Sequence, residues 1–188
     1  MKIGILSLQG NYSEHFKKLS EFDLKTILVK NKTDLFKCDG LIIPGGESTS
    51  ISKMLDYKDL RKSVLDIKDK IHIMGVCAGM VLLSDTQDYR NLKTLSIMNF
   101  KVKRNAWGRQ IHSFNSKIKL SFLNERINAT FIRAPKIISY SKKIECLGEF
   151  NEEPILLTDG KHLASSFHPE YSEGFAVYDY FLNLIDKN

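Results

Sequence analysis

The fold is decided by the stretch Ile71-His72-Ile73-Met74-Gly75-Val76-Cys77-Ala78-Gly79-Met80-Val81-Leu82-Leu83. An apolar run meets a Gly-x-Cys-x-Gly pentapeptide and continues as a second apolar run, which predicts a strand, a sharp turn and a helix. Glycines on both sides of Cys77 leave room for a strained backbone and for close packing of the strand on the helix. This pattern is typical of a nucleophile elbow, although an inert cysteine buried between two core segments has the same local sequence.

On the elbow interpretation, Cys77 stands at the carboxyl end of the strand and the N-terminus of the helix points at its sulfur. The positive end of a helix dipole favours the thiolate over the thiol. A free cysteine has a pKa of about 8.5, so a nucleophile needs such activation at neutral pH. Cys77 is therefore the candidate nucleophile.

Length and composition indicate one globular domain over residues 1–188. The chain has 188 residues, with 43% hydrophobic and 27% charged residues, which suits a single domain with a sizeable core. No apolar run approaches the roughly 20 residues that a membrane span needs. Residues 1–8 carry one lysine and a short apolar run without a small-residue cleavage site, so they predict a first buried strand rather than a signal peptide.

The three cysteines, Cys38, Cys77 and Cys146, are few and odd in number. A disulfide framework is therefore not expected, and the pattern favours a reducing, cytoplasmic location. The formal net charge is +6, but the lysines are spread over the whole chain, which favours a mildly positive surface over a nucleic-acid site.

Strand and helix patterns alternate in the first half of the chain. Strands are expected at residues 2–8, 24–29 and 39–43, and a helix in which Tyr12, Phe16 and Leu19 recur at helical spacing follows the first strand. Residues 55–68 are expected to be helical and to lead into the elbow strand. Such alternation predicts parallel strands joined by crossover helices, with ligands at the carboxyl ends of the strands.

The second half is richer in strand patterns, which suggests an added antiparallel extension of the sheet. A terminal amphipathic helix is expected from Phe175, Tyr178, Phe181, Leu182 and Ile185. The short strand-like runs are residues 97–103, 111–114, 118–122, 130–133, 144–150, 154–158 and 163–167.

The last of these runs delivers Phe167-His168-Pro169-Glu170. A histidine at the end of one parallel strand reaches a cysteine at the end of a neighbouring strand, and Glu170 can orient the imidazole from its far nitrogen. His168 and Glu170 thus complete a triad with Cys77. The other histidines, for which structural roles are expected, are His15, His72, His112 and His162.

A second Gly-rich turn, Pro44-Gly45-Gly46-Glu47-Ser48-Thr49, follows the strand at residues 39–43. Two glycines ahead of a helix free backbone N–H groups to face an anion, with Ser48 or Thr49 as the candidate helix cap. The alternative interpretation is a tight connection without a binding role.

The elbow and the His-Pro-Glu segment together resemble the triad of class I glutamine amidotransferases. Further motifs narrow the resemblance to the glutaminase subunits of two-component pyridoxal 5'-phosphate synthases, and they extend from residue 4 to residue 170. Val76 and Trp107 depart from residues usual in that family. The motifs are Leu8-Gln9-Gly10 with Glu14-His15, the Gly-rich turn at residues 44–49, Arg104-Asn105-Ala106-Trp107-Gly108-Arg109-Gln110, Ser113-Phe114 and Phe131-Ile132-Arg133-Ala134-Pro135.

The resemblance implies a three-layer α/β fold, in which helices flank a mostly parallel central sheet with added antiparallel strands. It implies hydrolysis of L-glutamine to glutamate and ammonia by Cys77, His168 and Glu170. Ammonia would pass to a synthase subunit that builds pyridoxal phosphate from a pentose phosphate and a triose phosphate. No metal site or dinucleotide-binding glycine pattern is present in the sequence, and no cofactor or metal is expected.

By the same resemblance, the backbone N–H groups of Gly46 and Ala78 would hold the oxyanion. Glu47 would pair with the α-amino group of glutamine and an arginine with its α-carboxylate. The residues expected to line the glutamine pocket are Gly45, Gly46, Glu47, Arg104, Ile132 and Arg133.

Two other functions fit parts of this pattern. One is an elbow-cysteine hydrolase of similar fold, of the peptidase or deglycase type, which would require neither His-Pro-Glu after the last strand nor the Gly-rich turn. The other is a protein that regulates a synthase without turning over glutamine, against which the intact triad argues.

Overall fold

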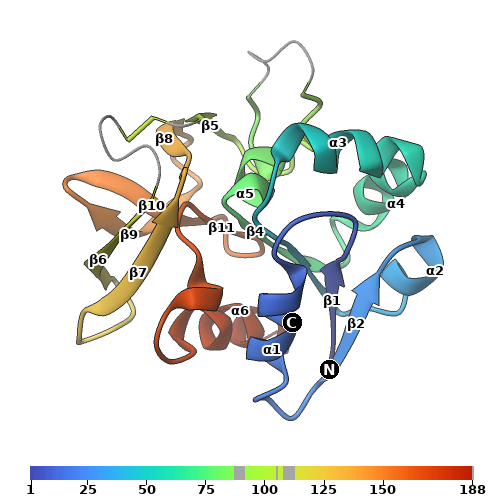
Figure 1. Ribbon diagram of the computed structural model, residues 1–188, viewed down its shortest axis with the longest axis horizontal. Helices are drawn as coiled ribbons and strands as arrows, with labels where there is room; N and C mark the ends of the chain where they lie inside the picture. The colour runs from blue at the N-terminus through green and yellow to red at the C-terminus, as the bar shows by residue number, and fades with distance from the viewer. Residues whose placement is uncertain (87–91, 105, 108–112, 188) are drawn as a thin grey trace.

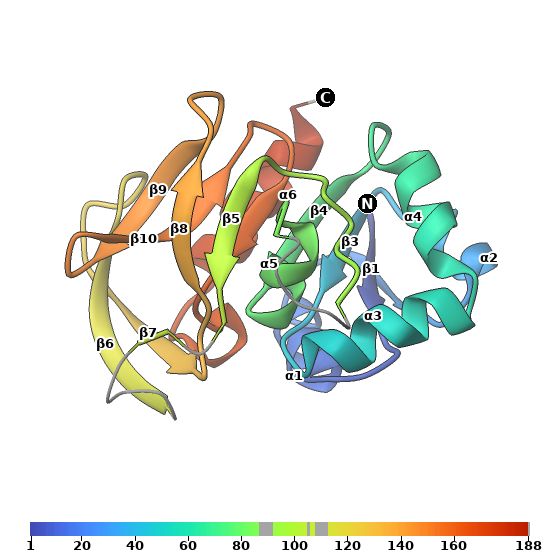
Figure 2. The same ribbon diagram turned by 90° about the horizontal axis from the view of Figure 1, so that it is seen from above.

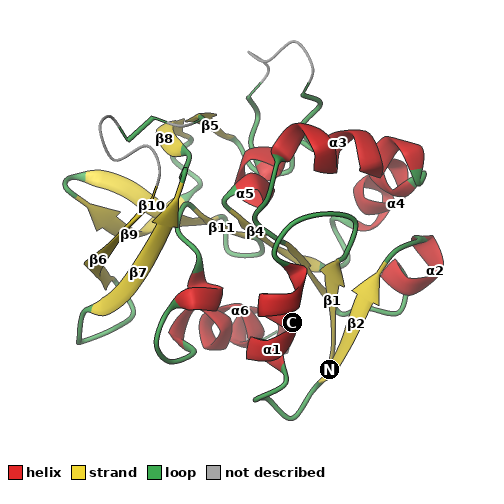
Figure 3. Ribbon diagram, in the orientation of Figure 1, coloured by secondary structure: helices red, strands yellow, loops and turns green. Residues whose placement is uncertain are grey.

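The structure is a computed structural model that describes residues 1–86, 92–104, 106–107 and 113–187. A nine-stranded sheet in the order β2-β1-β3-β4-β11-β10-β9-β6-β7 forms its centre, and a two-stranded sheet pairs β5 with β8 (Figures 1 and 3). The strands are β1 (Lys2–Leu6), β2 (Lys25–Val29), β3 (Gly40–Ile43), β4 (His72–Val76), β5 (Phe100–Lys103), β6 (Ser113–Leu120), β7 (Ile127–Ile132), β8 (Lys136–Tyr140), β9 (Glu145–Phe150), β10 (Glu153–Thr158) and β11 (Leu163–Ser165).

The large sheet has a parallel half and an antiparallel half. Strands β2, β1, β3, β4 and β11 pair in parallel, and β10, β9, β6 and β7 extend the sheet in antiparallel pairs. The parallel strands β3 and β4 are buried along their whole length, whereas β6 alternates between more and less exposed positions. This difference follows from helices covering both faces of the parallel half. The mixed sheet expected from the sequence is confirmed.

Helices lie on both faces of the sheet (Figures 1 and 2). One core contains apolar residues of α2, α3, α4 and α5 together with β5 and β8. The other core contains residues of α1 and α6. The helices are α1 (Tyr12–Leu19), α2 (Lys32–Leu35), α3 (Ser48–Tyr57), α4 (Leu60–Ile67), α5 (Ala78–Leu83), the short 3-10 helix η2 (Pro169–Tyr171) and α6 (Ala176–Asp186).

The buried face of α1 agrees with the expected one except at Phe16, since Leu19 is buried and Tyr12 packs against the same core. Phe16 is 42% exposed, whereas the neighbouring His15 is completely buried. Apolar spacing alone favoured Phe16, but adjacent positions on a helix differ by about 100° in direction, so only one of the two faces the core. The helix therefore directs a polar ring inward.

Three other expectations about local structure need correction. The helix expected at residues 55–68 is two helices, α3 and α4, because the chain turns at Asp59, which has a left-handed φ of 53°. The cap of α3 is the Glu47 side chain rather than Ser48 or Thr49, and it accepts the N–H groups of Thr49 and Ser50. Strand β8 was not expected.

The antiparallel strands lie close to where strand-like runs were expected, but they begin and end at different residues. Where two runs were expected, at residues 111–114 and 118–122, β6 continues unbroken from Ser113 to Leu120. Residues 111 and 112 lie outside the described residues, as do Asn105, Gly108, Arg109 and Gln110 of the expected motif.

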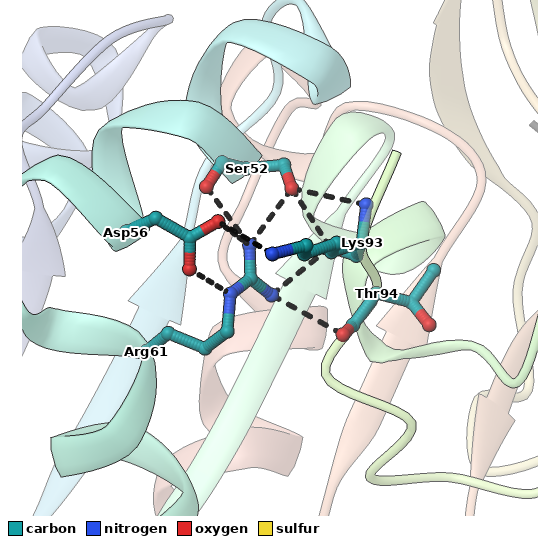
Figure 4. Close-up of polar contacts among 5 residues, drawn as sticks. All are labelled: Ser52, Asp56, Arg61, Lys93 and Thr94. Atoms are coloured by element: carbon teal, nitrogen blue, oxygen red, sulfur yellow. Dashed lines mark hydrogen bonds and ion pairs between the residues drawn. The ribbon is translucent and has the colours of Figure 1, made fainter. Parts of the chain in front are cut away.

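Arg61 joins α4 to α3 and to the chain that leads from α5 to β5 (Figure 4). Its guanidinium bonds Asp56 at 2.6 Å and donates to the Ser52 carbonyl at 2.8 Å and to the carbonyls of Lys93 and Thr94 at 3.0 and 3.2 Å. The planar fork of arginine suits this convergence of acceptors. The contacts fix the path of the segment that continues through β5 to Arg104.

Candidate active site

The cysteine lies on a strained turn between β4 and α5. Cys77 has φ 50° and ψ −100°, a backbone conformation that residues other than glycine rarely adopt. A side chain at Gly79 would overlap the backbone carbonyl of Ile43, and one at Gly75 would come within 2.6 Å of the Gly79 backbone. The two glycines therefore allow α5 to pack directly on the sheet, and the expected elbow is confirmed.

Backbone contacts from two parts of the sheet place His168 beside this turn. Strand β11 pairs with β4 in parallel, and the Cys77 N–H donates to the Ser165 carbonyl at 2.8 Å. Two residues beyond Ser166, the His168 N–H donates to the Thr130 carbonyl of β7 at 2.8 Å. The parallel half of the sheet thus supplies the cysteine, and the antiparallel half holds the histidine in place.

The side chains of His168 and Glu170 form a buried pair. His168 Nδ1 and Glu170 Oε1 are 2.6 Å apart, with residue exposures of 2% and 4%. Burial lowers the pKa of His168, but the interactions with Cys77 and with the charged Glu170 outweigh it and raise this pKa to about 10. Burial also acts to raise the pKa of Glu170, but His15 and the His168 hydrogen bond lower it on balance. At neutral pH Glu170 is therefore a carboxylate, and His168 is a strong enough base to take the Cys77 proton and become an imidazolium.

Cys77 and His168 are adjacent without forming an aligned hydrogen bond. The thiol of Cys77 donates to the Ile132 carbonyl at 3.6 Å, and His168 Nε2 is buried with no hydrogen-bond partner among the described residues. Catalytic hydrogen bonds in substrate-free structures are often long and tighten only with substrate.

A cavity of about 360 Å³ opens above the cysteine. It holds nearly all of the residues expected to bind substrate, and Gly45, the exception, packs directly against the His168 ring. The lining residues are Gln9, Gly10, Asn11, Gly46, Glu47, Ser48, Cys77, Ala78, Val81, Arg104, Ile132, Arg133, Pro135 and His168.

Glu47, which is expected to bind the α-amino group of glutamine, contacts Arg104, one of the two arginines expected in the pocket. Arg104 Nη2 lies 3.2 Å from Glu47 Oε1, and the same carboxylate accepts the N–H groups of Thr49 and Ser50 at 3.0 and 2.6 Å. Burial alone would raise the pKa of Glu47, but these backbone hydrogen bonds lower it. Arg133 adds a second cation on the cavity wall, at a left-handed φ of 44°.

The two expected oxyanion donors line the cavity beside Cys77. Ala78 is the first residue of α5, where backbone N–H groups have no acceptor within the helix. Gly46 has φ 152° and packs against the Gln9 side chain, whose Oε1 accepts the Glu47 N–H at 3.1 Å. The Gly45 carbonyl accepts the Asn11 N–H at 3.0 Å. The turn at residues 9–11 therefore fixes the orientation of the peptide that carries the Gly46 N–H.

His15 and Trp107 also lie near the site and were not assigned to it from the sequence. His15 Nε2 lies 3.6 Å from Glu170 Oε2, and His15 Nδ1 lies 2.7 Å from the hydroxyl of Tyr178. Trp107 donates its indole N–H to the Pro135 carbonyl at 3.3 Å and packs on Phe131. The segment with Glu14 and His15 was a signal for the first of these contacts. Nothing in the sequence connected it to Tyr178.

No metal centre is found in the part of the chain that the structure describes, where no three His, Cys, Asp or Glu side chains gather as ligands. Among the same residues, no helix has the length and apolar character to cross a membrane.

Comparisons with known proteins agree with this geometry. A family model described as the SNO glutamine amidotransferase family matches residues 5–187. The protein named pyridoxal 5'-phosphate synthase subunit PdxT from Tropheryma whipplei (strain TW08/27) is 43% identical over 187 residues, covering 98% of each chain. Its counterpart of the same name from Thermosipho africanus (strain TCF52B) is 37% identical over 188 residues, covering both chains completely.

Solved structures show the same fold. A structure described as a glutamine amidotransferase superposes with a TM-score of 0.91 at 34% identity, covering 98% of each chain. The structure of PurLQS from Thermotoga maritima superposes with a TM-score of 0.68 at 13% identity, covering 97% of each chain, which supports the fold alone.

Proposed function

The chain belongs to the SNO glutamine amidotransferase family, and from this premise we propose that Cys77, His168 and Glu170 are the triad with which it hydrolyses L-glutamine. The chain is the glutaminase subunit of a pyridoxal 5'-phosphate synthase and supplies ammonia for that synthesis. The observation that carries the assignment of the triad is the buried His168–Glu170 pair at 2.6 Å beside a cysteine on a strained elbow.

In the first half-reaction, the Cys77 thiol passes its proton to His168 Nε2, and the resulting thiolate attacks the side-chain amide carbon of glutamine and forms a carbon–sulfur bond. The charge that develops on the amide oxygen is held by the N–H groups of Ala78 and Gly46. His168 then gives its Nε2 proton to the amide nitrogen, the carbon–nitrogen bond breaks and ammonia leaves. The interactions with Cys77 and Glu170 that raise the pKa of His168 hold this proton on the ring while the thiolate attacks.

In the second half-reaction, water attacks the glutamyl thioester. His168, now neutral, takes a proton from this water, the carbon–sulfur bond breaks and glutamate leaves with the oxygen of the water. The sulfur departs as a thiolate and takes the proton back from His168, so both groups return to their starting state. The overall reaction consumes one glutamine and one water and yields glutamate and ammonia.

For substrate binding, we propose that the α-ammonium group of glutamine approaches Glu47 and that its α-carboxylate approaches Arg104 or Arg133. Because Glu47 and Arg104 are paired at 3.2 Å without substrate, the zwitterionic end of glutamine can insert between two opposite charges that already face each other. Such a pair binds an amino acid better than either charge alone because both of its ends find a partner.

We propose that ammonia passes to a separate synthase subunit, which on binding also completes the oxyanion hole. The Gly45 carbonyl and the Gly46 N–H belong to one trans peptide and point in opposite directions. Movement of the Asn11 N–H, which holds this carbonyl, would therefore rotate the oxyanion donor. A partner that contacts the turn at residues 9–11 would thus act directly on the rate of the chemical step.

The free thiols of the three cysteines support a reducing, cytoplasmic compartment.

The experiment is to measure glutamate release from the protein alone and with saturating cognate synthase. Losing one oxyanion donor costs about 10²- to 10³-fold in rate, so the partner is expected to raise kcat much more than it changes KM. Equal kcat values in both conditions would show that the hole is already assembled. Absence of glutamate release even with the synthase and its sugar phosphates would overturn the glutaminase assignment itself.

A further inference from the structure

The second oxygen of the Glu170 carboxylate is buried beside a histidine that the mechanism above does not use. Oε1 bonds His168, whereas Oε2 has no hydrogen-bond partner among the described residues. The nearest ion-pair partner of Oε2 is His15 Nε2 at 3.6 Å, which is also buried without a hydrogen bond in the described part of the chain. Buried polar atoms are rarely left alone. Two such atoms that face each other across 3.6 Å therefore indicate an interaction.

Tyr178 determines which nitrogen of His15 carries the proton. The Tyr178 hydroxyl lies 2.7 Å from His15 Nδ1, and Tyr178 is 1% exposed on α6. A neutral imidazole has one donor and one acceptor nitrogen. If the hydroxyl donates to Nδ1, the proton of the ring is on Nε2 and points at the anionic oxygen. The opposite tautomer would direct a lone pair at this oxygen, which is electrostatically unfavourable.

The charges around these rings support the same arrangement. Burial lowers the pKa of His15, so the ring is neutral at pH 7. Burial and the charge of Glu170 raise the pKa of Tyr178 well above its ordinary value, so the hydroxyl keeps its proton and can donate it. Glu14 on α1 and His168 also act on His15.

We propose that His15, held in the Nε2–H tautomer by Tyr178, is a positioning residue that orients the Glu170 carboxylate and through it the His168 ring. The inference rests on the proposed function of Cys77, His168 and Glu170. The separation of 3.6 Å becomes an ordinary hydrogen bond if the pair closes by about 0.5 Å. The polar chain Tyr178–His15–Glu170–His168 then connects α6 and α1 to the nucleophile.

The test compares His15→Leu, His15→Gln and Tyr178→Phe in the complex with the synthase. Leucine removes the donor, and kcat is expected to fall about ten- to a hundredfold because a buried charged acceptor loses its partner. Glutamine presents an amide N–H near the place of Nε2 and is expected to restore most of the activity. Tyr178→Phe removes the hydroxyl that fixes the tautomer of His15. It is expected to lower kcat several-fold, which is a smaller effect than that of His15→Leu.

A pH profile separates positioning from general destabilisation. With Glu170 less well held, the His168 imidazolium loses stabilisation, and the alkaline midpoint of kcat is expected to move to lower pH by about one unit in His15→Leu. The matched control is His162→Leu. His162 is also buried, and its Nδ1 accepts the Ile73 N–H at 3.2 Å near the other end of β4. This control is expected to lower Tm without moving the midpoint.

Three results would overturn the inference. The first is that His15→Leu and Tyr178→Phe both keep the kcat and the alkaline midpoint of the wild-type protein. The second is a loss in His15→Gln as large as in His15→Leu, which would remove the role of the donated hydrogen bond. The third is the same midpoint shift in the His162 control. A wild-type complex without glutaminase activity would instead refute the proposed function.

Discussion

Gly45→Ala tests whether the Gly-rich turn sets the position of the catalytic imidazole. A Cβ atom at position 45 would lie 3.1 Å from His168 Nδ1 and less than 3.0 Å from its Cε1. Ordinary carbon–carbon contacts lie at about 3.5–4.0 Å, so the ring must move by on the order of 1 Å. The backbone at position 45 is not in the left-handed region. Crowding of the ring is therefore the main effect of the added methyl group.

A displacement of this size is expected to cost about 10²-fold in kcat, because reacting groups tolerate little misplacement. The imidazole borders a cavity into which it can shift, so the loss of stability should stay within about 1–3 kcal/mol, the usual range for overpacking. The assay is glutamate release with saturating synthase, combined with thermal unfolding of the same preparation.

Gly160→Ala is the matched control. It adds the same methyl group at a left-handed φ of 87°, with no atom within 4 Å, in the turn before β11. Backbone strain of about 1–2 kcal/mol is expected there without a change in kcat. If Gly45→Ala keeps kcat within threefold of the wild-type value while remaining folded, the proposed contact does not position the histidine, and the reasoning fails.

Cys77→Ala is expected to abolish glutamate release with Tm retained, since only the sulfur is lost from the elbow; residual turnover in a pure preparation would contradict the assignment. His168→Asn is expected to lower kcat far more than Glu170→Gln, because the histidine moves protons in both half-reactions and the glutamate orients it. Equal losses in folded variants would count against this division of roles. An electrophilic glutamine analogue is expected to label Cys77 before Cys38, whose pKa burial raises to about 11, and before Cys146, whose pKa burial also raises. Peptide mass mapping that finds the label mainly on the other two thiols would refute the activation of Cys77.

Local sequence was sufficient to predict the elbow and its partner. The elbow depends on glycines within two residues of Cys77, which the sequence contains directly. That His168 lies near Cys77 requires one further inference, namely that their strands are neighbours, because the carboxyl ends of neighbouring parallel strands meet at one edge of a sheet. The pairing of β11 with β4 confirms that step.

Contacts between distant polar groups were not predictable in the same way. Glu47 pairs with Arg104 across 57 positions of the chain, and its use as the cap of α3 depends on the exact start of that helix. The sequence does not predict strand β8 because two apolar residues stand in succession there, although Ile137 is buried and Ile138 is 62% exposed. Tertiary packing, rather than local propensity, decides such edge strands.

The orientation of α1 shows why such a failure can itself be informative. A helix that turned Phe16 inward would bury a large apolar side chain, which is worth about 1.5–3 kcal/mol. Instead the protein exposes part of Phe16 and buries His15, a polar ring that needs partners to offset the cost of burial. Tyr178 and Glu170 provide those partners from two other elements. A fold selected for stability alone has no evident reason to prefer this arrangement, since violations of the apolar pattern concentrate at functional sites. The burial of His15 in place of Phe16 is therefore in line with the proposed role of His15 next to the triad.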